Sequence, residues 1–265
     1  MGYHIDTRAG GGDAACGDFA EHVDLDACRS AIFVGDVAGR GPAAGRGARM
    51  LQSYVRAALH GTSSLAWCLQ ATDSFFSRGI LCDATPFASL FVAIIDSASG
   101  SVSYASAGHE PALLFDDAGR HRHLEPTGPI LGLQALGTQA FRERRLPPVK
   151  DGLLVIVTDG ITEARRANGR GLELFGSTGV VRAVQRAERG GRDTATAIHQ
   201  AAEDHAHGVL VDDACVAVSA VTAGVTVPAS AVMRSTPEPY LSLRPERGSS
   251  NRRRWLLPVA RGRAS

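Results

Sequence analysis

The sequence predicts an α+β fold in which antiparallel sheets form a layered sandwich and helices are grouped outside them. The expected order is strand, helix, helix, several hairpin strands, helices and strand, which lacks the regular alternation of a parallel-sheet fold. Tight turns join successive strands, as the turn at residues 97–100 does. A chain of 265 residues can bury one good core, so we expect a single domain with a tail.

Strands are predicted where apolar residues alternate with polar ones or form short continuous runs. These stretches are residues 3–7, 31–35, 87–96, 101–107, 112–115, 121–124, 153–158 and 214–221.

Helices are predicted where apolar residues recur at spacings of three and four. The first covers residues 43–59, with Pro42 suited to its first turn. Its expected inner face consists of Ala44, Ala48, Leu51, Val55, Ala58 and Leu59. The second covers residues 63–78 with Leu65, Leu69, Thr72 and Phe76 inward, and two later helices are expected near 178–188 and 194–205.

The charge distribution separates a body from a tail. Residues 225–265 carry eight Arg and two Glu, a net charge of +6, and their Pro, Ser and Arg content predicts a disordered tail. This tail is either a solvated basic end or a docking segment for an acidic partner or an anionic membrane surface. Because the whole chain has a net charge of +1, residues 1–224 sum to −5, which does not suggest a nucleic-acid-binding domain.

The five cysteines are irregularly spaced and include no C-x-x-C pair, so reduced thiols are expected rather than disulfides or a zinc site. The first residues lack the apolar core of a signal peptide, and no apolar run reaches the roughly 18 residues of a membrane span. The sequence therefore predicts a cytoplasmic protein with no membrane span.

Acidic residues stand beside predicted core strands. Asp36 and Asp159 follow apolar runs, Asp212 and Asp213 precede the last strand, and Asp18 follows Cys16-Gly17. Carboxylates placed in this way can converge at one sheet edge, where their mutual repulsion favours a hard divalent cation such as Mg²⁺ or Mn²⁺. A lone Asp before Gly is more often a turn residue, so spacing alone gives only a candidate acidic site.

Six segments, in the expected order over roughly residues 3–222, resemble motifs of the bacterial SpoIIE-type serine phosphatases, a branch of the PPM or PP2C superfamily. They are CGDFAE, GDVAGRGPAA, SAGHEPALL, GPILGL, TDGITEARRANGRGLELFG and VDDACVAV. The resemblance implies a four-layer α-β-β-α sandwich of two antiparallel sheets, with the phosphatase domain in residues 1–224.

The resemblance also implies two Mn²⁺ or Mg²⁺ ions and a catalytic role for Asp36 and Asp159. The implied ligands are Asp18, Asp36 as the bridge, the backbone carbonyl of Val37, Asp159, Asp212 and, as a secondary position, Asp213. The implied reaction is in-line attack of a metal-bound hydroxide on phosphoserine or phosphothreonine without a phosphoenzyme. The implied substrate is a phosphorylated STAS-type anti-anti-sigma protein in a partner-switching pathway.

The first motif departs from the family pattern. Cys16 replaces its first glycine, and Gly11-Gly12-Asp13 lies just upstream, so Asp13 is the alternative to Asp18 as the first ligand. Asp18 fits better in its 18-residue spacing to Asp36. Glu21 replaces the second acid of the motif and keeps a carboxylate.

Other departures concern the substrate. Arg40 stands where many relatives carry His; it can bind phosphate but cannot act as an acid near neutral pH. His109 is either an acid near the leaving group or a loop residue that orders a turn. Glu163 and Arg165 are expected to stabilise the segment after Asp159. Cys215 replaces a Thr and is read as a packing change.

Two rival functions stay open: a phosphatase acting on another phosphoprotein, and a non-catalytic module that binds a phosphorylated partner. The helix at 43–59 begins directly after the metal segment, so its movement would displace Asp36. Because the first predicted strand begins at residue 3, we expect no sensor domain before it, and this predicts either constitutive activity or control by a separate sensor or activator chain.

Overall fold

The computed structural model describes residues 2–10, 16–77, 87–133, 141–168, 171–190, 193–208 and 210–224. Asp13 and the tail at 225–265 lie outside the described residues, as does the last residue expected for the second helix. None of the described helices is long and apolar enough to span a membrane.

Two five-stranded sheets form the centre of the molecule. The first contains, in spatial order, β1 (Tyr3–Arg8), β12 (Ala214–Thr222), β9 (Asp151–Val157), β6 (Ala112–Phe115) and β7 (His121–Leu124). The second contains β2 (Asp18–Asp24), β3 (Arg29–Val37), β4 (Ala88–Asp96), β5 (Ser101–Ala107) and β8 (Arg144–Arg145). Neighbouring strands in both sheets run antiparallel, which confirms the predicted α+β class.

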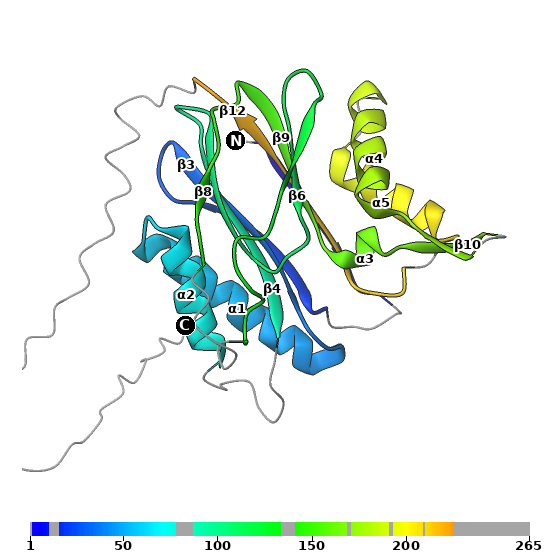
Figure 1. Cartoon of the computed structure of the whole chain (residues 1–265), viewed down its shortest axis with the longest axis horizontal. Coiled ribbons are helices and arrows are strands. Elements are labelled where there is room, and N and C mark those ends of the chain that lie inside the picture. The colour runs from blue at the N-terminus through cyan, green and yellow to red at the C-terminus, as the bar shows by residue number, and fades with distance from the viewer. Residues whose placement is uncertain are drawn as a thin grey trace, which may run out of the picture.

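Helices cover the outer face of each sheet (Figure 1). The helices α1 (Gly41–Gly61) and α2 (Leu65–Ser77) lie over the β2–β5 sheet. The other sheet is covered by α4 (Gly176–Gly190) and α5 (Thr194–His205), with the short α3 (Asp159–Thr162) beside them. A separate hairpin of β10 (Arg165–Asn168) and β11 (Gly171–Leu174) projects next to α3.

Three apolar layers hold the four layers of backbone together. One lies between α1–α2 and the second sheet, one between the two sheets, and one between the first sheet and α3–α5. Strand β3 shows why its apolar run is continuous: Ala31 and Phe33 point to the helix side, while Ile32 and Val34 point between the sheets. The packing therefore has the four-layer α-β-β-α arrangement.

The predicted helices and most strands are confirmed within a few residues. The expected inner face of α1 is buried except for Ala58, which is partly buried. The sequence reading missed β2, α3, β8 and the β10–β11 hairpin. It also ended the strand before Asp36, whereas β3 continues through Asp36 to Val37.

Candidate active site

Asp18 and Asp36 come from neighbouring strands. They occupy the same register position of β2 and β3, so their side chains lie side by side where the strands meet. Asp18 is only 5% exposed, and Asp36 is half-buried. Burial and the nearby Asp159 raise the pKa of Asp36 to about 6. Burial and the adjacent Asp36 raise the pKa of Asp18 as well, so this pair resists carrying two negative charges without a cation.

Thr158 links the two sheets beneath this pair. Its hydroxyl Oγ1 donates a hydrogen bond of 2.6 Å to Asp18 Oδ2. The backbone N–H of Cys215 in turn donates to Thr158 Oγ1 at 2.8 Å. Asp18 is thus held by the residue that follows strand β9 of the opposite sheet. This contact aligns the two sheets at the acidic edge, which we define as the end of the sandwich that carries Asp18, Asp36, Asp159 and Asp212.

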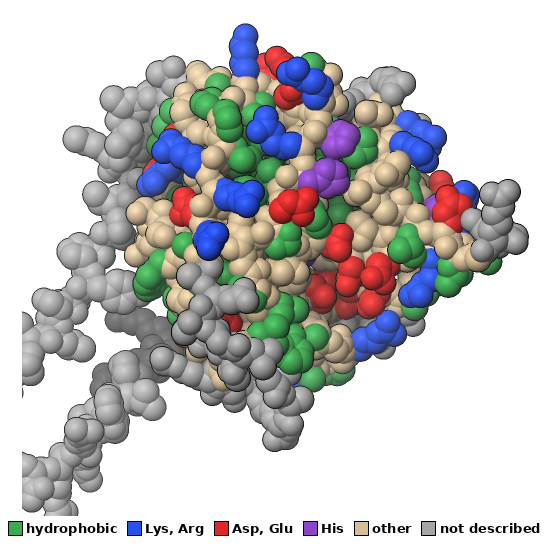
Figure 2. All heavy atoms as spheres, in the orientation of Figure 1, with side chains coloured by type: hydrophobic (Ala, Val, Ile, Leu, Met, Phe, Trp, Pro, Cys, Tyr) green, Lys and Arg blue, Asp and Glu red, His purple; other side chains and the backbone are tan. Residues whose placement is uncertain are grey.

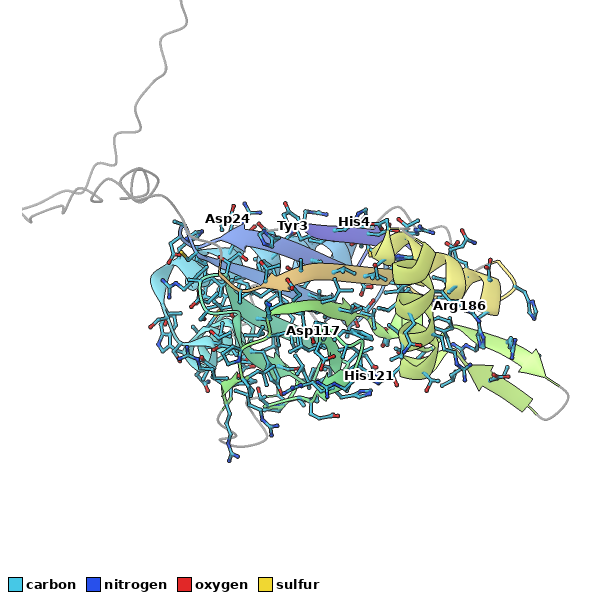
Figure 3. The ribbon with its side chains drawn as sticks, turned by 90° about the horizontal axis from the view of Figure 1, so that it is seen from above. Tyr3, His4, Asp24, Asp117, His121 and Arg186 are labelled. Atoms are coloured by element: carbon cyan, nitrogen blue, oxygen red, sulfur yellow. The ribbon has the colours of Figure 1, made fainter. Side chains whose placement is uncertain are left out.

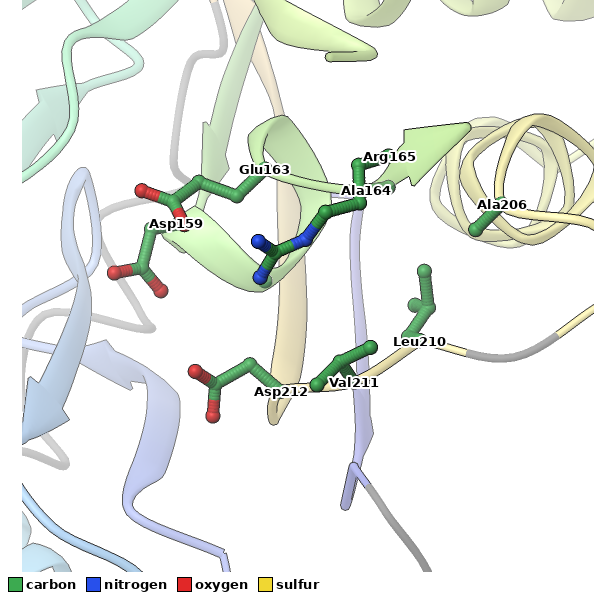
Figure 4. A pocket seen from close by; sticks show the side chains of 9 residues that line it. Asp159, Glu163, Ala164, Arg165, Ala206, Leu210, Val211 and Asp212 are labelled. Atoms are coloured by element: carbon green, nitrogen blue, oxygen red, sulfur yellow. The ribbon is translucent and has the colours of Figure 1, made fainter. Parts of the chain in front are cut away.

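Asp159 and Asp212 approach from the first sheet. Asp159 is the first residue of α3, two residues beyond the end of β9, and Asp212 lies in the loop before the adjacent strand β12. Burial, followed by Asp212 and Glu163, raises the pKa of Asp159. A small pocket of about 30 Å³ lies here, and its lining includes Asp159, Glu163, Arg165 and Asp212 (Figure 4).

Asp213 has a different role from its neighbour in the structure. Its two carboxylate oxygens accept hydrogen bonds from the backbone N–H of Gly10 at 2.8 Å and of Gly17 at 2.7 Å. The side chain therefore ties the segment before Asp18 to the loop that carries Asp212. Gly160 makes this arrangement possible, because a Cβ there would lie 1.8 Å from the carbonyl oxygen of Asp213.

The structure places the remaining predicted residues around this edge. Arg40, the residue before α1, has a guanidinium nitrogen 3.4 Å from Asp212 Oδ2, and both side chains are largely exposed. Glu21 faces the helix layer instead, where its carboxylate pairs with Arg56 of α1. Asp18 is therefore the acid of the first motif that joins the cluster, and Asp13 lies outside the described residues.

His109 is buried in the wall of a pocket of about 160 Å³ that Asp36, Glu110 and Asp159 also line. Its Nδ1 lies 2.6 Å from the hydroxyl of Ser89, the β4 residue opposite Asp36. Burial lowers the pKa of His109 to about 4, so the ring is neutral near pH 7. This geometry favours the ordering role over proton donation.

Sequence reasoning missed Glu110 as part of the site and gave Glu163 only a structural role. Burial and then Asp159 raise the pKa of Glu110, and the side chain of Glu163 lies beside Asp159. The only sequence signals were that Glu110 directly follows His109 and that Glu163 lies in the segment after Asp159-Gly160. Figure 2 shows the result, acidic side chains gathered in one hollowed region of the surface.

The donor set fits a hard divalent cation. Carboxylate and carbonyl oxygens are the ligands that Mg²⁺ and Mn²⁺ prefer, and the raised pKa values show carboxylates short of positive charge. Gly17 has no side chain to crowd two of these donor atoms. A Cβ at this position would lie 2.7 Å from the carbonyl oxygen of Val37 and 3.5 Å from Asp36 Oδ1. Among the described residues, no group of three or more His, Cys, Asp or Glu side chains is arranged so that it could hold a metal ion.

Comparison with known proteins decides the family. The model of the family described as Stage II sporulation protein E (SpoIIE) matches residues 26–222. The chain belongs to the SpoIIE family. The matched range includes the strand that carries Asp36, the short helix that begins with Asp159 and the loop that carries Asp212.

Two curated relatives match shorter segments. Protein IcfG of Synechocystis is 36% identical over 83 residues, which are 31% of this chain and 13% of IcfG. The phosphoserine phosphatase RsbP of Bacillus subtilis is 36% identical over 69 residues, which are 26% of this chain and 17% of RsbP. The chain therefore matches less than a fifth of the length of either relative.

Several solved structures share the fold of this chain. The PP2C phosphatase domain of SpoIIE from B. subtilis superposes with a TM-score of 0.70 at 16% identity, covering 84% of this chain and 64% of that one. The PP2C domain of SiaA from Pseudomonas aeruginosa gives 0.68 at 18% identity, covering 82% and 84%. The RsbU and RsbW domains of a Mycobacterium tuberculosis protein give 0.68 at 22% identity, covering 84% and 62%.

Proposed function

We propose that this SpoIIE-family chain is a metal-dependent phosphatase that hydrolyses phosphoserine and phosphothreonine in proteins. The observation that carries the proposal is the convergence of Asp18, Asp36, Asp159 and Asp212 from four segments at one edge of the sandwich. Three of these carboxyl groups have raised pKa values because of burial and mutual repulsion. Divalent cations relieve that repulsion and suit the hydrolysis of a phosphate ester.

We assign the metal ligands as Asp18, Asp36 between two ions, the Val37 carbonyl, Asp159 and Asp212. Two bound Mn²⁺ or Mg²⁺ ions would polarise the phosphoryl group and lower the pKa of a water molecule. The rest of the chain orients these ligands: Thr158 holds Asp18, and Asp213 holds the backbone at Gly17.

Groups at the rim are assigned to the substrate. Arg40 lies exposed beside Asp212, where its guanidinium can orient a phosphate by paired hydrogen bonds. The neutral imidazole of His109 fixes the position of Ser89 next to Asp36 rather than supplying a proton.

The proposed substrate is a phosphorylated STAS-type anti-anti-sigma protein in a partner-switching pathway in the cytoplasm. Support comes from RsbP, whose name states a phosphoserine phosphatase, and from similarity to RsbU domains and to a stressosome protein. We assign this activity to residues 1–224, which are followed by an appended tail at residues 225–265. We also propose that a separate sensor or activator chain controls the activity.

Hydrolysis of an aryl phosphate with and without Mn²⁺ tests the activity. Asp36→Asn should lower turnover by roughly 10³-fold, since several kcal/mol of transition-state stabilisation depend on bound metal. The matched control is Asp117→Asn, an exposed aspartate in the turn between β6 and β7 (Figure 3), which should leave turnover unchanged. Equal activity of Asp36→Asn and wild type would refute the proposed site.

A second measurement separates the rival functions. If folded, metal-loaded wild type binds a phosphorylated STAS protein but hydrolyses neither it nor the aryl phosphate, the chain is a phosphoprotein-binding module. If it hydrolyses the aryl phosphate and another phosphoprotein but not the STAS phosphoserine, only the substrate assignment fails.

A further inference from the structure

A basic pocket lies on the side of the molecule formed by the β10–β11 hairpin, α4 and α5. Its volume is about 310 Å³. It is lined by Arg166, Glu173, Leu174, Phe175, Gly179, Arg182, Ala183, Arg186, Ala201, Asp204 and His205. None of these residues is a proposed metal ligand, so the pocket is distinct from the acidic edge.

Two arginines of α4 give the pocket its unbalanced charge. Arg182 and Arg186 are four residues apart, so they share one face of the helix, and both are exposed. No carboxylate within the described part of the chain forms an ion pair with either guanidinium. Figure 3 shows Arg186 on the part of α4 next to the hairpin.

The other charged groups of the pocket already have partners. Arg166 of β10 pairs with Glu173 of β11 at 3.0 Å, and Asp204 accepts a hydrogen bond of 2.9 Å from Gln200. Arg182 and Arg186 are therefore the cationic groups left for a ligand, and guanidinium groups bind carboxylates by paired hydrogen bonds.

Apolar groups complete the surface. The ring of Phe175 packs edge-on against His205 with centroids 5.6 Å apart, and Ala183 and Ala201 add to the lining. On the adjoining hairpin, Leu172 and Leu174 are 67% and 55% exposed. Exposed leucines beside unpaired arginines are typical of a surface that contacts a protein segment rather than a small ion.

We propose that this pocket docks an acidic segment of a protein partner, one that combines carboxylates with an apolar side chain. A nucleic acid fits less well, because the exposed Leu172 and Leu174 beside the pocket offer apolar contacts that a phosphate backbone cannot use. The chain's own tail, with eight Arg and two Glu, has the wrong charge to occupy it.

The docked segment would bridge the hairpin and α4. The base of the hairpin is closed by the N–H of Phe175, which donates to the carbonyl of Ala164 at 2.8 Å, and Ala164 follows α3 closely. Because α3 begins with Asp159, the pocket is connected by a short stretch of backbone to the acidic edge.

Fluorescence anisotropy with a labelled peptide of glutamates and two leucines tests the docking on the full chain. Wild type should bind it saturably, and Arg182→Glu/Arg186→Glu should weaken binding at least ~10-fold, since two charge-assisted contacts are reversed. The control Arg122→Glu/Arg142→Glu makes the same charge change at two exposed sites outside the pocket and should stay within about twofold of wild type. A peptide with serines in place of leucines should bind more weakly.

Circular dichroism melting checks that each variant folds, and Arg182→Ala/Arg186→Ala gives a milder change that should weaken binding in the same direction. Absence of saturable binding to wild type would overturn the proposal. Equal weakening in the control would also overturn it, because the attraction would then be general. Tighter binding of a single-stranded oligonucleotide of equal charge would assign the pocket to nucleic acid instead.

Discussion

The two sheets contribute to the acidic edge in different ways. The second sheet supplies Asp18 and Asp36 from within paired strands, where both are held in register and Asp18 is almost completely buried. The first sheet supplies Asp159 from the start of a short helix and Asp212 from a loop, and the side chain of Asp212 is 55% exposed. The first pair is therefore positioned by the ladder, whereas the second can adjust to an ion and a substrate.

The largest expected effect separates these two pairs. Asp18→Asn should lower Mn²⁺-dependent hydrolysis by roughly 10²–10³-fold, because Asp18 is a buried ligand that Thr158 holds in place. Asp212→Asn should cost only about 10-fold, since its loop lets water or another oxygen fill the position. Turnover of an aryl phosphate over a range of Mn²⁺ concentrations measures both.

Asp13→Asn is the control for this experiment. It should have little effect if Asp18 is the first ligand. A large loss with Asp13→Asn and a small one with Asp18→Asn would show that the upstream aspartate holds the ion and that register with Asp36 is not what positions the ligand.

The buried pair should also destabilise the metal-free protein near neutral pH. A carboxyl group whose pKa is raised in the folded state binds protons more strongly there, so stability falls as pH rises from the unfolded pKa near 3.8 to about 6. Asp36→Asn removes this cost and should raise the free energy of unfolding at pH 7 by on the order of 2 kcal/mol, with the gain vanishing near pH 4. Urea denaturation of metal-free wild type and variant at both pH values measures it.

Added Mn²⁺ should reverse this order, stabilising wild type and leaving Asp36→Asn nearly unchanged. A metal-free variant that is less stable than wild type at pH 7 would mean that the Asp18–Asp36 pair is already compensated by the protein.

The same contrast explains what the sequence could predict. Apolar periodicity identified β3, β4, β9 and β12, because each crosses a core and must alternate or remain apolar. The motifs identified the acids, but β2 was missed because Glu21 and His22 interrupt its apolar alternation. Glu21 lies on the helix side because it pairs with Arg56, a contact that depends on tertiary packing.

The β10–β11 hairpin that follows Asp159 was not predicted, for a different reason. Strand β11 is exposed at every position, so the hairpin has no apolar period to detect. Its place is set by the hydrogen bond from Phe175 to Ala164 and by α4 and α5, which only the folded chain brings together. Tertiary context likewise separated Asp212, which faces the edge, from Asp213, which binds backbone.

A smaller effect is expected where Asp213 joins the two sides of the edge. Asn at this position keeps one acceptor, but its amide group faces the second N–H donor, so one of the bonds to Gly10 and Gly17 is lost. Asp213→Asn should lower the free energy of unfolding by about 1–3 kcal/mol. Denaturation measures the loss, and Mn²⁺ titration should show weaker binding, since Gly17 precedes Asp18. Unchanged stability would mean that the loops are held by other contacts.

The smallest effect is expected at the open side, where Arg40 meets Asp212. The ion pair is long and exposed, so Arg40→Gln should change the free energy of unfolding by less than about 0.5 kcal/mol. Its guanidinium is available to the substrate phosphate, so KM for a phosphopeptide should rise several-fold while kcat changes little. Arg40→Lys should restore only part of the affinity, because an ammonium group lacks the planar paired donors. A fall in kcat with constant KM would instead show that Arg40 stabilises the transition state. The exposed side of the site would then be as important for catalysis as the buried Asp18–Asp36 side.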